Sequence, residues 1–445
     1  VTPPPEGANI IEKPSAPAKP EIENQVDKDS AKTDSLVTNA PILFQHFPDV
    51  LPLAGRELNY PESALFYEKN RLKKAATISA IFARYCQLLL VPYPQSFYYG
   101  TGKVPVVDFK NVYAIAGLLL LLVLLLGVLR YYRSKSIWVF GTFCFLITYS
   151  ISSNIVVPMP GMMAERFVYF ASLGFCLLLA WLIVKLLKID FKTPEVSFKI
   201  LTQKGVIICG VLLTLFSGLT ILRNFDWKNE YKLYSADIKH SGNSVQVNFM
   251  LARNLNGQAY QAESNEDFNR LINEAITYYQ RSVELYSGYG NAWFDMGTAA
   301  KAIGNMPLTI SCYTKASHLL PDFPDPNEQL AFIYQQQGQF DSAIVYYNKA
   351  LAISESNPDV FLNYGMLRLN QGELRQGIEL TKRAVALNPN LYNGFINLGK
   401  AYERLGQIRD AIFWYEKALA LNPAEQGLAG HIENLRHTTQ SVPAP

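Results

Sequence analysis

The apolar residues of this 445-residue chain are concentrated between residues 75 and 222, in long stretches that charged residues hardly interrupt. A bilayer core about 30 Å thick is crossed by about 20 mainly apolar residues of an α-helix. Four uninterrupted stretches meet this length: 112–129, 137–157, 168–187 and 206–222. A fifth stretch, 75–91, carries Arg84 and Gln87 in its middle, so it either spans the membrane or lies partly buried against the other helices. The pattern predicts a helical membrane domain of four or five spans.

From about residue 244 the pattern changes to a repeat of 34 residues, in which small residues and glycines keep one register. The two sets are Gly297, Ala331, Gly365 and Gly399, and Gly304, Gly338, Gly372 and Gly406. This is the tetratricopeptide pattern, in which the small residue lets helix A approach helix B and the later glycine makes the turn. Four regular units are predicted to start at Gly290, Pro324, Pro358 and Tyr392.

The regular units have less regular neighbours at both ends. An earlier unit is predicted from helices over 244–258 and 271–285, with the polar stretch 261–270 inserted between them. A helix over 428–437 is expected to cap the open end of the array.

The predicted fold class is therefore all-α, a transmembrane helical bundle followed by a tetratricopeptide-repeat α-solenoid. The expected divisions are a disordered Pro/Lys/Glu-rich linker (1–40), a membrane-proximal segment (41–74), the transmembrane domain (75–222), a connector (223–243), the repeats with their cap (244–437) and a tail (438–445). Because the chain begins with Val1 inside a hydrophilic stretch, we interpret it as a fragment of a longer protein.

Composition narrows the possible partners. Charged residues make up 17% of the chain, against about 25% in ordinary soluble proteins, which indicates that lipid solvates part of it. The net charge of +3 and the absence of a long Lys/Arg run argue against a nucleic-acid partner. The five cysteines and five histidines show no ligand spacing, so no metal site is expected.

Basic residues in the short loops predict the orientation, because lysine and arginine near helix ends are retained in the cytoplasm. The loops 130–135 and 185–204 are basic, whereas the turn 158–167 has only Arg166. We therefore expect the loop 92–110 and everything after Arg223 to lie outside the cytoplasm. The membrane is expected to be a bacterial inner membrane. The reversed topology, with cytoplasmic repeats, is the alternative.

Three polar features of the membrane part are candidates for chemistry. Placing the Arg84 charge inside a membrane segment costs a few kcal/mol unless it faces protein, water or an anion, so Arg84 is a candidate functional residue. The alternative is that its side chain snorkels to the membrane surface or forms an internal salt bridge. Arg166 at the outer boundary could bind a lipid phosphate bidentately with Glu165 orienting it, or the two could form a helix-start ion pair. The outer loop is rich in proline and aromatic residues, and its candidate residues are Ser96, Tyr98 and Tyr99.

One phase of helix A carries a carboxylate or carboxamide in all four regular units. These residues are Asp295, Gln329, Asn363 and Asn397. A carboxamide can donate to and accept from the backbone of an extended peptide without reading its side chains. The row resembles the asparagine ladder of the nucleocytoplasmic O-linked N-acetylglucosamine transferase, which holds acceptor polypeptides; four solvated helix residues are the alternative. Other groove candidates are Phe332, Met366 and Lys400.

The membrane part also resembles a family. Arg84-Tyr85, the following run 88–94 with Ser96 and Tyr99, the stretch 164–169 and the exit 223–227 are similar to regions of the transmembrane and tetratricopeptide-repeat O-mannosyltransferases and their bacterial relatives. These are C-type superfamily glycosyltransferases. The resemblance covers about residues 71–237 and the order of the domains. An aspartate usual in the family before the loop tyrosine is Tyr98 here.

The resemblance implies a carboxy-terminal part of a membrane glycosyltransferase. It would move a sugar, with mannose as first candidate, from a polyprenyl-phosphate carrier to a protein hydroxyl, while the repeats recruit the acceptor. The family's catalytic acidic residue lies in the first outer loop, which we expect upstream of Val1. Arg84 and Arg166 would contact the carrier phosphate, with Glu165 as orienting partner. A non-enzymatic membrane-anchored scaffold for protein interactions is the alternative.

Overall fold

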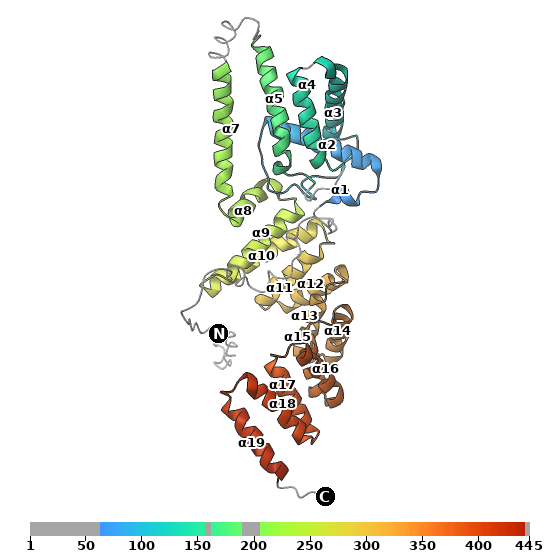
Figure 1. Ribbon diagram of the computed structural model, residues 1–445, viewed down its shortest axis with the longest axis vertical. Helices are drawn as coiled ribbons and strands as arrows, with labels where there is room; N and C mark the ends of the chain where they lie inside the picture. Colours follow the sequence, from blue (N-terminus) through green and yellow to red (C-terminus); the bar gives the residue numbers. More distant parts are fainter. Residues whose placement is uncertain (1–62, 135, 156–161, 189–204, 441–445) are drawn as a thin grey trace, which may run out of the picture. The chain divides into compact units, whose positions relative to one another are not determined.

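The computed structural model describes residues 63–134, 136–155, 162–188 and 205–440. Every regular element in these ranges is a helix, which confirms the predicted all-α class (Figure 1). The predicted linker 1–40 and most of the predicted tail 438–445 lie outside the described residues.

Among the described residues of the membrane part, three helices are long and apolar enough to cross a bilayer: Val112–Ser134, Tyr169–Leu186 and Val206–Asp226. The elements are α1 (Ala64–Tyr67), α2 (Arg71–Leu90), α3 (Val112–Tyr131), η3 (Tyr132–Ser134), α4 (Ile137–Ser152), η4 (Glu165–Val168), α5 (Tyr169–Leu186) and α7 (Val206–Asp226). The expected count of four or five spans is thus approximate.

Helix α4 is apolar but shorter than the predicted span over 137–157. The hydroxyl of Ser153 donates to the carbonyl of Ser150 at 2.7 Å, and Asn154 has φ +61°. Local side-chain bonds and a left-handed residue both compete with helical continuation, so α4 ends at Ser152.

Close packing in the membrane part depends on small residues. A Cβ on Gly117 of α3 would lie 1.8 Å from the carbonyl oxygen of Ser79 in α2, and a Cβ on Gly174 of α5 would lie 2.5 Å from the backbone nitrogen of Phe145 in α4. Glycine therefore permits the backbone contacts of α2 with α3 and of α4 with α5. The fifth apolar stretch belongs to α2, whose buried face packs along α3.

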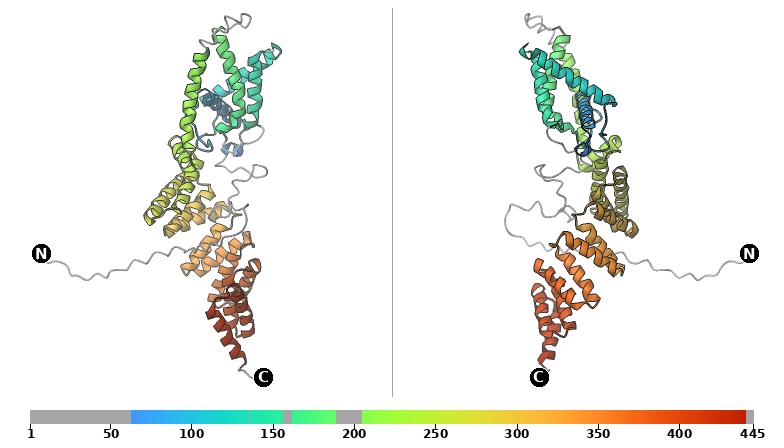
Figure 2. Two further views of the ribbon diagram at one scale, coloured as in Figure 1. Left: turned by 60° about the vertical axis from the view of Figure 1, so that its left-hand side comes forward. Right: turned by 90° about the vertical axis from the view of Figure 1, so that its right-hand side faces the viewer.

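The repeat part is a series of helix pairs, each packed on the next (Figures 1 and 2). The pairs are α9 (Val245–Ala259) with α10 (Asn265–Leu285), α11 (Gly290–Ala302) with α12 (Met306–Leu319), α13 (Asp325–Gln336) with α14 (Phe340–Ile353), α15 (Pro358–Asn370) with α16 (Leu374–Leu387), and α17 (Tyr392–Arg404) with α18 (Ile408–Leu421). The cap is α19 (Gln426–Gln440), which buries Ile432 and Leu435 against α18.

The 34-residue period has the physical basis that the sequence indicated. The four turn glycines have φ between +72° and +85°, a conformation that side chains with a Cβ adopt only with strain. A Cβ on Gly399 would lie 2.3 Å from the buried ring of Tyr415, so the contact of helix A with helix B requires glycine there.

The predicted insert over 261–270 is wrong in its second half, because α10 begins at Asn265. The hydroxyl of Ser264 accepts the backbone N–H of Asp267 at 3.0 Å and caps the helix. Glu266 and Asp267 occupy the first turn, where acidic side chains favour the helix dipole.

The predicted connector 223–243 is largely occupied by α8 (Glu230–Ser241). Leu233 and Tyr234 of α8 are buried in one core with Phe249 of α9 and Tyr279 of α10. Helix α8 is therefore packed as the first element of the repeat part.

Candidate functional site

The candidate site is built around the loop between α2 and α3, which meets α8 of the repeat part. The backbone N–H of Phe97 donates to Asp237 Oδ2 at 2.5 Å. The hydroxyl of Ser96 lies 3.3 Å from the same oxygen and 3.0 Å from the hydroxyl of Ser241. The outer loop is thus fastened to α8 by a cluster of buried polar groups.

Asp237 also joins α8 to the end of α7. Its side chain is 1% exposed and its Oδ1 lies 2.9 Å from Arg223 Nη1, which in turn lies 3.2 Å from Asp226 Oδ2. Removing one partner of a buried pair leaves an uncompensated charge, which is strongly destabilising. We therefore expect the contact between Asp237 and Arg223 to hold α8 at the end of α7. Sequence reasoning missed Asp237; its only signal was the exit motif that contains Arg223.

Arg84 faces a small cavity of about 70 Å³ near the end of α2. The cavity is lined by Arg84, Gln87, Leu88, Tyr93, Pro94, Tyr99, Lys103 and Met163. The Arg84 guanidinium carbon lies 4.8 Å from the centroid of the Tyr113 ring, a cation–π contact. The ion pairs between described side chains do not include Arg84, and the side chain of Glu165 lies outside the described residues, so the internal salt bridge considered above stays an alternative.

Lys103 brings a second cation to this cavity from the outer loop. Burial and the neighbouring Arg84 charge lower the pKa of the Lys103 amine, while Asp237 acts in the opposite direction. The ammonium donates to the backbone carbonyl of His240 at the end of α8. Within the described part of the chain, the lining of this cavity contains two cationic side chains and no carboxylate, an arrangement that suits a negatively charged group.

The other residues predicted as candidates in the membrane part differ in where they lie relative to this cavity. The side chains of Glu165 and Arg166 lie outside the described residues; their backbone belongs to η4. The chain just before them reaches the cavity, because Met163 lines it, and the hydroxyl of Tyr85 accepts the N–H of Ala164 at 2.9 Å. Tyr99 lines the cavity, whereas Ser96 is a buried structural residue whose hydroxyl also donates to the carbonyl of Tyr98.

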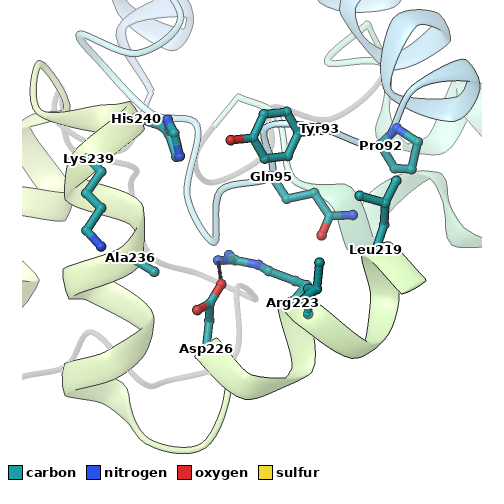
Figure 3. A pocket seen from close by; sticks show the side chains of 10 residues that line it. Pro92, Tyr93, Gln95, Leu219, Arg223, Asp226, Ala236, Lys239 and His240 are labelled. Atoms are coloured by element: carbon teal, nitrogen blue, oxygen red, sulfur yellow. Dashed lines mark hydrogen bonds and ion pairs between the residues drawn. The ribbon is translucent and has the colours of Figure 1, made fainter. Parts of the chain in front are cut away.

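A second, larger cavity of about 300 Å³ lies between the same loop and the α7–α8 corner (Figure 3). Its walls are Pro92, Tyr93, Gln95, Leu219, Leu222, Arg223, Asp226, Ala236, Lys239 and His240. No sequence pattern indicated this cavity, because its walls come from segments more than a hundred residues apart.

The structure divides the predicted polar row of the repeats into two halves. Asp295 is buried and lies 3.8 Å from Arg253 Nε, and Gln329 Oε1 accepts a hydrogen bond from Lys301 Nζ at 2.7 Å. Asn363 and Asn397 are half-buried and have no side-chain hydrogen-bond partner among the described residues. Within the described part of the chain, Asn363 and Asn397 therefore have both polar ends of the carboxamide available to a ligand, whereas the amide oxygen of Gln329 is engaged.

The neighbours of this row include both apolar and charged groups. Phe332 contacts the Lys301 ammonium 5.6 Å from its ring centroid, Met366 is half-buried and Lys400 is exposed. Burial, with the nearby carboxylates of Asp325 and Asp359, raises the pKa of Glu328 to about 7.

The helical membrane spans and the stacked helix pairs define the class: a membrane protein that carries tetratricopeptide repeats. Family models agree, since residues 333–372 match a TPR repeat model and residues 392–424 match a tetratricopeptide repeat model.

Among curated proteins, the chain is 24% identical over 242 residues to the protein O-mannosyl-transferase TMTC3 of Mus musculus, covering 53% of this chain and 24% of that protein. The Homo sapiens TMTC3 gives the same identity and coverage. The Drosophila melanogaster Tmtc3 is 26% identical over 170 residues, 38% of this chain and 16% of that protein. The resemblance seen in the sequence is confirmed, and the chain spans about a quarter of the length of its TMTC3 relatives.

The similar solved structures include YrrB and MamA. YrrB, described as a TPR protein with an unusual peptide-binding site, has 18% identity and a TM-score of 0.39, covering 46% of this chain and 99% of YrrB. MamA has 19% identity and a TM-score of 0.34, covering 37% of this chain and 99% of MamA.

Proposed function

We propose that this chain is the carboxy-terminal part of an integral membrane glycosyltransferase that moves a sugar from a polyprenyl-phosphate carrier to a protein hydroxyl. The observation that carries the proposal is the pair of cations, Arg84 and Lys103, at one cavity near the end of α2. The names of the curated relatives support mannose as the sugar and a protein as the acceptor.

The role of the two cations follows from the charge that develops in the reaction. The acceptor oxygen forms a bond to the anomeric carbon of the sugar as the bond from that carbon to the phosphate oxygen breaks. A phosphodiester with one negative charge becomes a phosphate monoester with two. Positive groups fixed beside the leaving oxygen therefore stabilise the transition state more than the ground state.

Other groups complete the proposed reaction. The acceptor proton would go to a carboxylate acting as general base, which the resemblance assigns to the first outer loop of the longer protein. Arg166 is proposed as a further phosphate contact and Glu165 as the group that orients it.

The repeats are proposed to hold the polypeptide acceptor outside the cytoplasm of a bacterial cell. The free carboxamides of Asn363 and Asn397 would bond to its backbone, and apolar groove residues such as Met366 would contact its side chains. Asp295 and Gln329 are assigned a structural role instead, since their side chains already have partners.

The proposal is tested by sugar transfer from polyprenyl-phosphate mannose in membranes that contain the full-length protein. Replacing one group that stabilises developing charge costs about 100-fold or more in rate, so Arg84→Met should lower transfer by at least that factor. The matched control is Arg71→Met, an exposed arginine in the first turn of the same helix, which should leave transfer unchanged.

Normal transfer by a folded Arg84→Met protein would remove the carrier-phosphate role. If the parent protein shows no transfer at all with any polyprenyl-phosphate sugar, the membrane-anchored scaffold becomes the better account.

A further inference from the structure

The larger cavity at the α7–α8 corner has an amphiphilic wall (Figure 3). Leu219 and Leu222 come from the last turns of α7, within the candidate membrane span Val206–Asp226. Lys239 and His240 come from the last turn of α8, beyond the span. The cavity therefore lies at the level where a bilayer changes from acyl chains to headgroups.

The charges around the cavity leave a positive side. The carboxylate of Asp226 is paired with Arg223, which is also paired with Asp237. Lys239 is exposed and has no ion pair among the described residues, and the His240 ring packs edge-on against Tyr93 at a centroid distance of 5.8 Å. Lys239, His240 and the Gln95 amide are thus available to an anion on one side, with two leucines on the other.

We infer that this cavity binds the headgroup of an anionic membrane phospholipid. Lys239 and His240 contact the phosphate, and an acyl chain lies along Leu219 and Leu222. A volume of about 300 Å³ is at the lower end of the range for small-ligand pockets, which suits a headgroup rather than a whole lipid. Basic side chains at a membrane surface gain affinity for anionic lipids in the same way.

The consequence concerns the repeats. Helix α8 shares its core with α9 and α10, so a lipid held by the end of α8 ties the start of the solenoid to the membrane surface. This cavity is separate from the proposed carrier cavity, which contains Arg84 and Lys103, although Tyr93 lines both. The inference stands whether or not the chain transfers a sugar.

The test is lipid retention, measured by native mass spectrometry on the full-length protein released from nanodiscs of phosphatidylglycerol and phosphatidylcholine. The parent protein should retain phosphatidylglycerol in preference to phosphatidylcholine. The double variant Lys239→Gln, His240→Gln should lose that retention about fivefold, as expected for the loss of one surface charge and one further donor. Lys232→Gln, an exposed lysine on the same helix that does not line the cavity, should retain the lipid normally.

Each other outcome overturns the inference in a distinct way. Equal retention by the double variant and the parent places the lipid elsewhere. Loss of retention in Arg84→Met but not in the double variant places the phosphate in the carrier cavity. Retention of phosphatidylcholine to the same extent removes the preference for an anion, and displacement of the lipid by millimolar inorganic phosphate indicates a site for a soluble phosphate.

Discussion

The repeat part and the membrane part differ in what determines which residues are buried. Polar residues that interrupt the hydrophobic pattern therefore have different roles in the two parts. In the repeats, a 34-residue period fixes which side chains are buried, so a residue of the polar row either has an internal partner, as Asp295 has, or stays available, as Asn363 does. In the membrane part, length and apolarity define the helices, and few residues of the spans are buried. Arg84 lies in α2, which packs against α3 and is not among these candidate spans, and we propose that its charge contacts a ligand.

The two parts meet at a small number of buried polar contacts, and breaking those should have the largest effect. Asp237→Ala leaves the half-buried Arg223 without its main partner and the Phe97 N–H without an acceptor. We expect a loss of about 3–5 kcal/mol in the free energy of unfolding, measured by urea unfolding of the solubilised protein.

The control is Asp226→Ala, which removes the other carboxylate of Arg223. Asp226 is 36% exposed, so its loss should cost less than about 1 kcal/mol. Equal losses in the free energy of unfolding for the two variants would contradict the assignment of Asp237 as the main partner of Arg223.

A second prediction tests the close approach that the repeat period requires. The extra methyl group of Gly399→Ala would lie 2.3 Å from the ring of Tyr415, whose hydroxyl is held by Glu403 at 2.9 Å. Overpacking of this kind costs about 1–3 kcal/mol in the free energy of unfolding. Gly427→Ala, at the start of α19 with no atom within 4 Å of the added carbon, should not destabilise the protein. A neutral Gly399→Ala would show that the helix pair can separate without cost.

A third prediction concerns the pH dependence of the repeat part. The pKa of Glu328 is about 7 in the folded protein, above its ordinary value of about 4.5, so the folded state binds more protons than the unfolded state between those pH values. The free energy of unfolding should therefore fall as pH rises from about 4.5 to 7. Partial exposure limits this contribution to about 1–2 kcal/mol.

Glu328→Gln should remove this part of the pH dependence, as measured by urea unfolding at pH 5 and pH 8. The neighbouring Asp325 and Asp359 remain in the variant, so only the slope that belongs to Glu328 should disappear. An unchanged slope would show that Glu328 is solvated and titrates normally.

The smallest expected effect is on polypeptide binding in the groove. Each neutral hydrogen bond contributes about 0.5–1.5 kcal/mol, so Asn363→Ala with Asn397→Ala should weaken binding of an unfolded polypeptide about five- to tenfold. Gln329→Ala should change the affinity less, because its amide oxygen is already engaged by Lys301. Fluorescence anisotropy with a labelled acceptor sequence measures both. Equal effects of the two changes would contradict the division of the row.

The sequence predicted what depends on local pattern. Three of the four regular repeats begin at the predicted residues Gly290, Pro358 and Tyr392, and the helix of the other begins at Asp325, one residue after the predicted Pro324. Turn glycines and small contact residues act within one unit, so their pattern is visible in the sequence. The predicted start of α10 was wrong because the side chain of Ser264 caps the helix, although the first turn after it is polar. Residue pattern alone also overestimated the length of α4.

The candidate site was predictable only in part. Arg84 and Tyr99 were found, because a charge within an apolar stretch and a loop rich in aromatic residues are visible in the sequence. Lys103, Asp237 and the partners of Gln329 were not, since each contact joins segments that are distant along the chain or lie in neighbouring repeats. The roles of Glu165 and Arg166 stay predictions.

The most direct test of the central claim is the affinity of a short-chain polyprenyl phosphate for the full-length protein, compared between the parent, Arg84→Met and Arg71→Met. A charged hydrogen bond contributes about 1.5–3 kcal/mol, so Arg84→Met should raise the dissociation constant at least about tenfold while Arg71→Met leaves it unchanged. Equal affinities for all three proteins would contradict the assignment of the Arg84 cavity to the carrier phosphate.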